Sequence, residues 1–77
     1  MNAKEMFEEL GYDLEIYSYL GYTYALKYQN YYFTVRFDLD NKSYEIFEYV
    51  YKNENGYCVD EKLQKSITQQ MKELEWI

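Results

Sequence analysis

The sequence predicts an α+β fold: an antiparallel meander of three to four strands, flanked by an N-terminal and a C-terminal helix (α-β-β-β(-β)-α). Three observations predict it. Apolar residues recur with helical spacing near both ends of the chain, and they alternate with polar residues through its middle. Turn-forming residues separate the alternating segments. We therefore expect a single small domain over residues 1–77.

The first helix is predicted over residues 3–10. Asn2 can cap it, and Glu5, three residues later, completes a capping-box pattern. Gly11 then stands where a left-handed residue often ends a helix. The apolar side of this helix would be formed by Met6, Phe7 and Leu10.

Alternation predicts the strands, with the clearest at about residues 31–39 and its neighbours at about 22–28 and 43–51. In the clearest strand one side carries Tyr31, Phe33, Val35, Phe37 and Leu39, and the other carries Tyr32, Thr34, Arg36 and Asp38. In the preceding strand, one side carries Tyr22, Tyr24, Leu26 and Tyr28. The last segment has no clean apolar side, which predicts partial cover on both. A further strand at about 13–19 would place Leu14 and Ile16 opposite Glu15 and Tyr17.

Turns are expected at residues 29–30 and 40–42, and a loop at residues 53–56. Asp60 would cap the second helix, with Glu61 in its first turn. The apolar stripe of that helix is Leu63, Ile67, Met71 and Leu74, with Trp76 after it. Two helices can cover one face of the sheet. The other face is then expected to carry part of the twelve tyrosines, since a phenol is apolar in its body and wet at its hydroxyl.

The charge balance argues against direct binding to nucleic acid. The formal net charge is −6, Arg36 is the only arginine, and the lysines are scattered along the chain. Neutralising phosphates requires a clustered basic face, which this pattern lacks. The same balance favours binding to a basic protein surface.

The residue inventory also predicts that the chain is not an enzyme and uses no cofactor or metal. Cys58 is the only cysteine and there is no histidine, so an ordinary zinc site and a paired cysteine nucleophile are both excluded. Asp38 opens a segment that begins like a calcium loop, but Ser43 and Tyr49 stand where that loop requires glycine and glutamate. A hairpin turn is expected there instead. With no long apolar run and no signal peptide, the expected location is cytoplasmic.

Three segments carry a resemblance to known proteins: "MNAKEMFEELGYD", "YYFTVRFDLDNKSYEIF" and "VDEKLQKSITQQMKELEW". In these segments the chain resembles a group of short acidic, tyrosine-rich proteins of unknown function, encoded by phages and mobile elements of Gram-positive bacteria. The shared pattern is a helix ending in Leu-Gly-Tyr, a tyrosine-rich meander and a last helix ending near Glu-Leu-x-Trp. The resemblance implies a small accessory protein in a phage-related gene set, and it supplies no functional residues.

These observations lead to the hypothesis of a non-enzymatic protein-interaction module. Its most specific form is an acidic inhibitor of a host nucleic-acid-binding enzyme, because spaced carboxylates can stand in for phosphates. The alternative is a structural or self-associating accessory domain that forms a homodimer. The residues expected to make protein contacts are Tyr22, Tyr24, Tyr32, Tyr49, Tyr51, Asp38, Asp40, Glu45 and Glu48.

Overall fold

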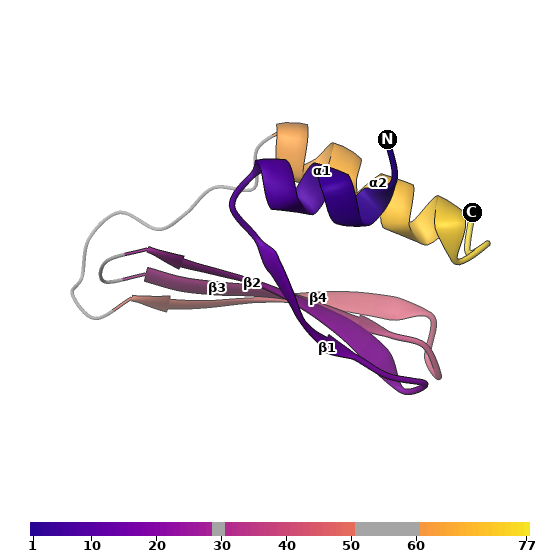
Figure 1. The fold of residues 1–77 in the computed structure, drawn as a ribbon. Helices are drawn as coiled ribbons and strands as arrows, with labels where there is room; N and C mark the ends of the chain where they lie inside the picture. Colours follow the sequence, from indigo (N-terminus) through magenta and orange to yellow (C-terminus); the bar gives the residue numbers. More distant parts are fainter. Residues whose placement is uncertain (29–30, 51–60) are drawn as a thin grey trace.

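The computed structural model describes residues 1–28, 31–50 and 61–77, with residues 28, 31, 49 and 50 described by their backbone alone. It has two layers: a four-stranded antiparallel sheet, and two helices packed together on one of its faces (Figure 1). The predicted α+β meander between two helices is confirmed, with four strands. The elements are α1 (Ala3–Glu9), β1 (Asp13–Tyr17), β2 (Gly21–Tyr28), β3 (Tyr31–Asp38), β4 (Ser43–Val50) and α2 (Glu61–Glu73).

The strands lie in chain order, β1-β2-β3-β4, and each pairs antiparallel with the next. The strand expected at 13–19 is present but shorter. The predicted turn at 40–42 is confirmed, since a turn over residues 39–42 joins β3 to β4. The expected turn at 29–30, the loop at 53–56, the Asp60 cap and Cys58 lie outside the described residues.

One expectation for β1 is wrong. The pairing of β1 with β2 shifts by one residue between Leu14 and Ile16, so Leu14 pairs with Tyr24 while Ile16 pairs with Thr23. Residues opposite each other in an antiparallel pair share a face of the sheet. Leu14 therefore lies on the helix side and Ile16 on the other side, because a bulge adds one residue and reverses the alternation beyond it.

The register of the central strands separates a packed face from an open one. On the helix side, Tyr24 pairs with Val35 and Leu26 pairs with Phe33. These residues and their neighbours form a core with side chains no more than 4% exposed: Phe7, Tyr12, Tyr24, Phe33, Val35, Phe37, Leu63 and Ile67. The described side chains of β4, those of residues 43–48, are not part of this cluster, and Tyr44 and Ile46 on its helix side are 36% and 38% exposed. The helices thus cover the central strands more fully than β4.

Aromatic contacts join the two layers. The rings of Phe7 in α1 and Tyr24 in β2 stack with centroids 3.9 Å apart, and Phe37 meets both rings edge-on. The Tyr24 hydroxyl donates a hydrogen bond of 2.6 Å to Oε1 of Gln70 in α2. Tyr24 is 2% exposed and Gln70 is 5% exposed, so both partners of this bond are buried and satisfied.

Both ends of α1 have the capping residues that the sequence predicted. The capping box at its start is present, with reciprocal bonds between Asn2 and Glu5. At its end Gly11 has a φ of 94°, and its N–H bonds the Glu8 carbonyl while the Tyr12 N–H bonds the Phe7 carbonyl. This is the Schellman arrangement. It places the Tyr12 ring edge-on against Phe7, at 5.7 Å, inside the core.

The end of α2 repeats this arrangement without a glycine. Glu75 has a φ of 61°, its N–H bonds the Lys72 carbonyl, and the Trp76 N–H bonds the Met71 carbonyl. The turn directs Trp76 onto Phe37, with ring centroids 6.2 Å apart. The two helices are further joined by the Ala3 N–H, which donates to Oε2 of Glu73 at 2.6 Å.

The two helix ends generate opposite predictions. Gly11→Ala should lower the free energy of unfolding by about 1–2 kcal/mol, because a Cβ is strained at positive φ and meets Leu26 at 3.1 Å. Glu75→Gly should raise it by about 1 kcal/mol by relieving the same strain. Urea unfolding measures both changes. Gln64→Gly, on the exposed side of α2, should instead destabilise by about 1 kcal/mol, and a loss of stability in Glu75→Gly would contradict the interpretation.

Burial generates a prediction at alkaline pH. Burial, followed by the charge of Glu73, raises the pKa of Tyr24 from 10 to about 12. Below pH 10 both the folded and the unfolded chain hold this proton. Between pH 10 and pH 12 only the unfolded chain loses it, so Tyr24 lowers the free energy of unfolding by about 2–3 kcal/mol across that range.

Tyr24→Phe removes this titration and should therefore lose less stability than the unmodified chain as the pH rises through that range. At neutral pH the same variant should be about 1–2 kcal/mol less stable, because Gln70 loses its buried donor. Tyr19→Phe is the control, since Tyr19 is 86% exposed and its hydroxyl is in water. Equal alkaline losses in the two variants, measured by urea unfolding, would show that Tyr24 is not the group responsible.

Candidate protein-binding surface on the open face of the sheet

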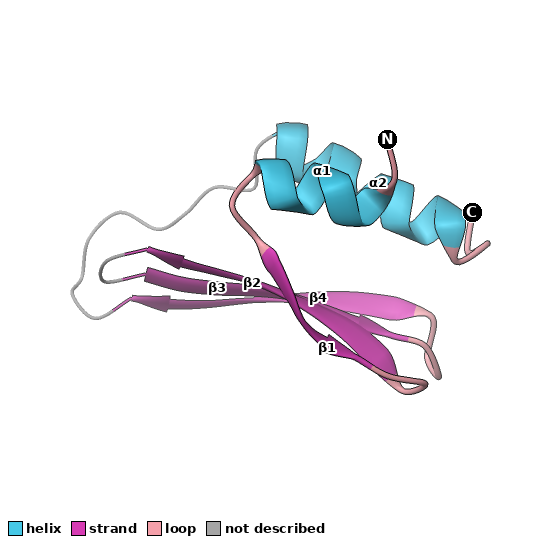
Figure 2. Cartoon of the chain, in the orientation of Figure 1, coloured by secondary structure: helices cyan, strands magenta, loops and turns pink. Residues whose placement is uncertain are grey.

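The face of the sheet opposite the helices is covered by no other element of the described chain (Figure 2). We call it the open face. Its centre consists of small side chains on the two middle strands: Thr23, Ala25 and Thr34. These are only 9%, 3% and 8% exposed, although no helix covers them, because longer side chains stand around them. The open face therefore has a low centre and a raised border.

The border contains exposed apolar side chains on both outer strands. Ile16 of β1 is 55% exposed and Phe47 of β4 is 38% exposed. Ile16 pairs with Thr23 and Phe47 pairs with Thr34, which places both on the open face. Exposed apolar side chains that lie on one face are groups that a protein partner could bury.

One end of the open face holds a polar cluster at the β1 bulge. The Lys27 ammonium lies 3.0 Å from Oε1 of Glu15, and the Tyr32 hydroxyl donates to Oε2 of Glu15 at 3.3 Å. Lys27 also lies 5.6 Å from the centre of the Tyr32 ring. The hydrogen bond from Lys27 is the main reason that the pKa of Glu15 is lowered from its ordinary value of 4.5. The cluster links β1, β2 and β3 across the face.

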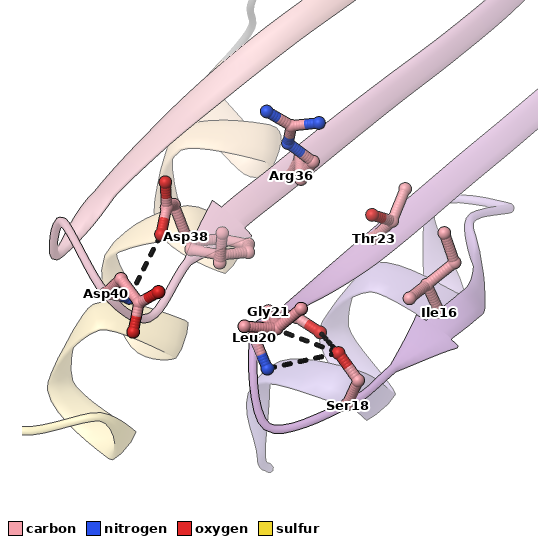
Figure 3. A pocket seen from close by; sticks show the side chains of 9 residues that line it. Ile16, Ser18, Leu20, Gly21, Thr23, Arg36, Asp38 and Asp40 are labelled. Atoms are coloured by element: carbon pink, nitrogen blue, oxygen red, sulfur yellow. Dashed lines mark hydrogen bonds between the residues drawn. The ribbon is translucent and has the colours of Figure 1, made fainter.

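The other end is organised around Arg36. Its guanidinium lies 3.7 Å from Oε2 of Glu45 and 5.8 Å from the centre of the Phe47 ring. Beside it, a shallow pocket of about 350 Å³ opens between the turns that follow β1 and β3 (Figure 3). The pocket is lined by Ile16, Ser18, Leu20, Gly21, Thr23, Arg36, Phe37, Asp38 and Asp40.

Two polar side chains of the pocket are engaged in holding its turns (Figure 3). The Ser18 hydroxyl accepts from the N–H groups of Leu20 and Gly21. The Asp38 carboxylate accepts from the N–H groups of Asp40 and Asn41 and from the Asn41 amide. The bond from the Asn41 side chain is the main cause of the lowered pKa of Asp38. The Ser18 hydroxyl and the Asp38 carboxylate therefore hold the two turns in place. They are not arranged as a nucleophile with a neighbouring base.

The predicted tyrosine contacts are placed in different environments. Tyr32 lies on the open face, half-buried. The prediction that Tyr24 contacts a partner is wrong. Its side chain points to the helices and is part of the core, so it is not accessible at the surface. Tyr22 is half-buried on the helix side, where its ring stacks on Tyr17 at 4.7 Å. Tyr49 pairs with Tyr32 through its backbone, while its side chain and the whole of Tyr51 lie outside the described part.

The four predicted carboxylates do not share one surface. Glu45 pairs with Arg36 on the open face, and Asp38 and Asp40 lie at the pocket beside it. Glu48 pairs with Phe33, which puts it on the helix side. Sequence reasoning missed Asp13 and Glu15, which the register places on the open face. The spacing of these two acids is visible in the sequence. The bulge that places Ile16 on the same face as them is not.

Both sides of the molecule carry an excess of carboxylates among the described residues. Five carboxylates lie on the open face or at its end: Asp13, Glu15, Asp38, Asp40 and Glu45. Two cations, Lys27 and Arg36, lie among them, and Lys42 belongs to the same turn as Asp40, which leaves an excess of two negative charges. The helix side carries seven glutamates, counting Glu48 of β4 and Glu75 after α2, and four lysines, which leaves an excess of three negative charges there as well. Among the described residues, what distinguishes the open face is therefore not its total charge but the exposed apolar side chains that lie among its carboxylates.

Comparison of the chain with protein families, with curated proteins and with solved structures finds no match in any of the three. Within the described ranges, no helix has the length and apolar character needed to cross a membrane. Nor do those residues bring together three side chains of the histidine, cysteine, aspartate or glutamate type in a metal-binding group.

The Glu15 cluster generates a prediction about titration. In the unmodified chain, the Glu15 carboxyl should titrate below 4.5, because Lys27 and Tyr32 stabilise its charged form. Lys27→Met removes the main partner and should raise the Glu15 pKa toward its ordinary value. Carbon-detected NMR titration of the carboxyl groups measures the shift. Lys65→Met on α2 is the matched control and should leave Glu15 unchanged; an unchanged Glu15 pKa in Lys27→Met would contradict the assignment.

Proposed function

We propose that this chain is a non-enzymatic protein-interaction module that binds a basic protein surface through its open face. The observation that carries this proposal is the combination of exposed apolar side chains, Ile16 and Phe47, with an excess of carboxylates around them. Apolar contacts supply affinity when they leave water, and a charged border selects and steers a partner of opposite charge. The partner would present apolar side chains flanked by lysines or arginines.

The most specific form of this function is inhibition of a host nucleic-acid-binding enzyme. Such enzymes carry basic channels for phosphates, and the carboxylates of the open face could occupy such a channel. The net charge of −6 and the resemblance to phage and mobile-element proteins support this version. Asp38, Asp40 and Glu45 would face the partner in this arrangement, together with Asp13 and Glu15, whereas Glu48 would not.

Self-association is the second candidate function, and a different surface favours it. The outer edge of β4 carries Tyr44, Ile46 and Phe47, each more than a third exposed. An edge strand of this kind can pair with another copy of the chain. The two functions share Phe47, but each also uses residues that the other does not, such as Asp13 and Ile46, so they can be tested separately.

The binding proposal can be tested by capture from a lysate of a Gram-positive bacterium with the tagged chain. Two variants neutralise two carboxylates each: Asp13→Asn with Asp40→Asn on the open face, and Glu9→Gln with Glu75→Gln on the helix side. Both change the net charge equally. The open-face variant should bind the captured protein about tenfold more weakly, whereas the helix-side variant should bind as the unmodified chain does.

Salt and nucleic acid separate the specific version from the general one. An inhibitor that occupies a phosphate channel should be released by duplex DNA or RNA, and its binding should weaken as salt rises. If salt releases the partner but nucleic acid does not, the chain is still a protein-interaction module, but the hypothesis that it inhibits a nucleic-acid-binding enzyme is wrong. Equal loss of binding in the two double variants would show that total charge, rather than the open face, governs binding.

A further inference from the structure

The two edges of the sheet differ in how well they are protected against pairing with another strand. β1 is five residues long, contains the bulge, and carries Asp13 and Glu15. Shortness and bulges are features by which edge strands avoid pairing, whereas charge does not distinguish the two edges, because β4 carries Glu45 and Glu48. β4 is eight residues long, and its register with β3 continues without a shift from Ser43 to Val50. In the described part of the chain, the outer edge of β4 pairs with no strand.

We propose that β4 pairs antiparallel with β4 of a second copy, around a two-fold axis at Ile46. The two sheets would then form one continuous sheet of eight strands. The helices of both copies would lie on the same side of that sheet, and both open faces on the other. This dimer gives a specific form to the self-association named above as the second candidate, and it does not rest on the binding function, because the open face outside the β4 edge stays accessible.

Self-complementarity of β4 identifies the second copy as the occupant. In such a pair the two-fold axis is perpendicular to the sheet, so each residue meets one that lies on the same face. A register centred on Glu45 or Glu48 would set two carboxylates directly opposite each other, which is unfavourable. A register centred on Ile46 sets Ile46 against its own copy and Tyr44 against Glu48. On the open face it sets Glu45 against Phe47.

Arg36 makes this register complementary in charge as well. In each copy its guanidinium lies near both the Glu45 carboxylate and the Phe47 ring. When Glu45 of one copy lies opposite Phe47 of the other, it is in line with Thr34 of the other copy's β3, two strand spacings away, and Arg36 lies two residues further along, so the Cα atoms of Glu45 and that Arg36 are about 12 Å apart. Two long side chains can bridge that distance. Centring the axis on Phe47 would instead set Ile46 against Glu48 and Glu45 against Tyr49. That register has neither the apolar Ile46 pair nor the approach of Glu45 to the other Arg36.

The register can be tested by disulfide trapping in a Cys58→Ser background, which removes the only native cysteine. Opposed residues in an antiparallel pair have Cα atoms about 4.5–5.5 Å apart, within the range that a disulfide spans. Under mild oxidation, Ile46→Cys should form a linked dimer at least tenfold faster than Gln64→Cys on the exposed side of α2. Equal rates would overturn the proposal, and so would faster linkage of Phe47→Cys than of Ile46→Cys.

Sedimentation equilibrium provides a second measurement that needs no cysteine. The unmodified chain should show a dimeric mass that falls to the monomeric mass on dilution. Ile46→Lys, which sets two ammonium groups against each other at the axis, should be monomeric at concentrations where the unmodified chain is dimeric. Ile16→Lys, on the other edge, should remain dimeric, with circular dichroism confirming that both variants fold. A monomeric mass for the unmodified chain at millimolar concentration would overturn the proposal.

Discussion

The fold depends on one aromatic stack and the hydrogen bond attached to it. Phe7 of α1 lies flat against Tyr24 of β2, and the hydroxyl of the same tyrosine bonds Gln70 of α2. Three elements from the two ends and the middle of the chain therefore meet at a single side chain. A small domain buries little surface, so large rings with few rotatable bonds contribute much of its core. Tyrosine serves here as a core residue with a polar end that the second helix satisfies.

This constraint also determines which side of the sheet is available. Both helices are held on the face that carries Tyr24. The opposite face therefore carries the strand residues whose side chains alternate with those of the core. On the central strands these are small, and on the outer strands and strand ends they are charged or apolar. The low centre and the acidic border thus follow from the same register that builds the core. The expectation that this face would carry the surplus tyrosines holds for Tyr32 alone among the described side chains.

Much of the fold could be predicted from the sequence because its signals are local. Asn2, Glu5 and Gly11 specify both ends of the first helix, and strict alternation specifies the faces of β2 and β3. The candidate surface was less predictable because it depends on register between strands. Alternation alone cannot reveal the bulge that reverses β1 beyond Leu14. The burial of Tyr24 likewise depends on which face of the sheet the helices cover, and the composition does not determine that face.

The hydrogen bond between Ala3 and Glu73 joins residues 70 positions apart, and it bears on the order in which the molecule folds. Each strand pairs with its neighbour in sequence, so closing those loops costs little chain entropy. The seven-residue α1 is too short to be stable alone and has its main partners on β2 and α2. We therefore expect the meander to form first and the helices to dock last. Tyr24 and Phe37 would then be covered only in that last step, because the rings they meet from the helix layer are those of Phe7 and Trp76.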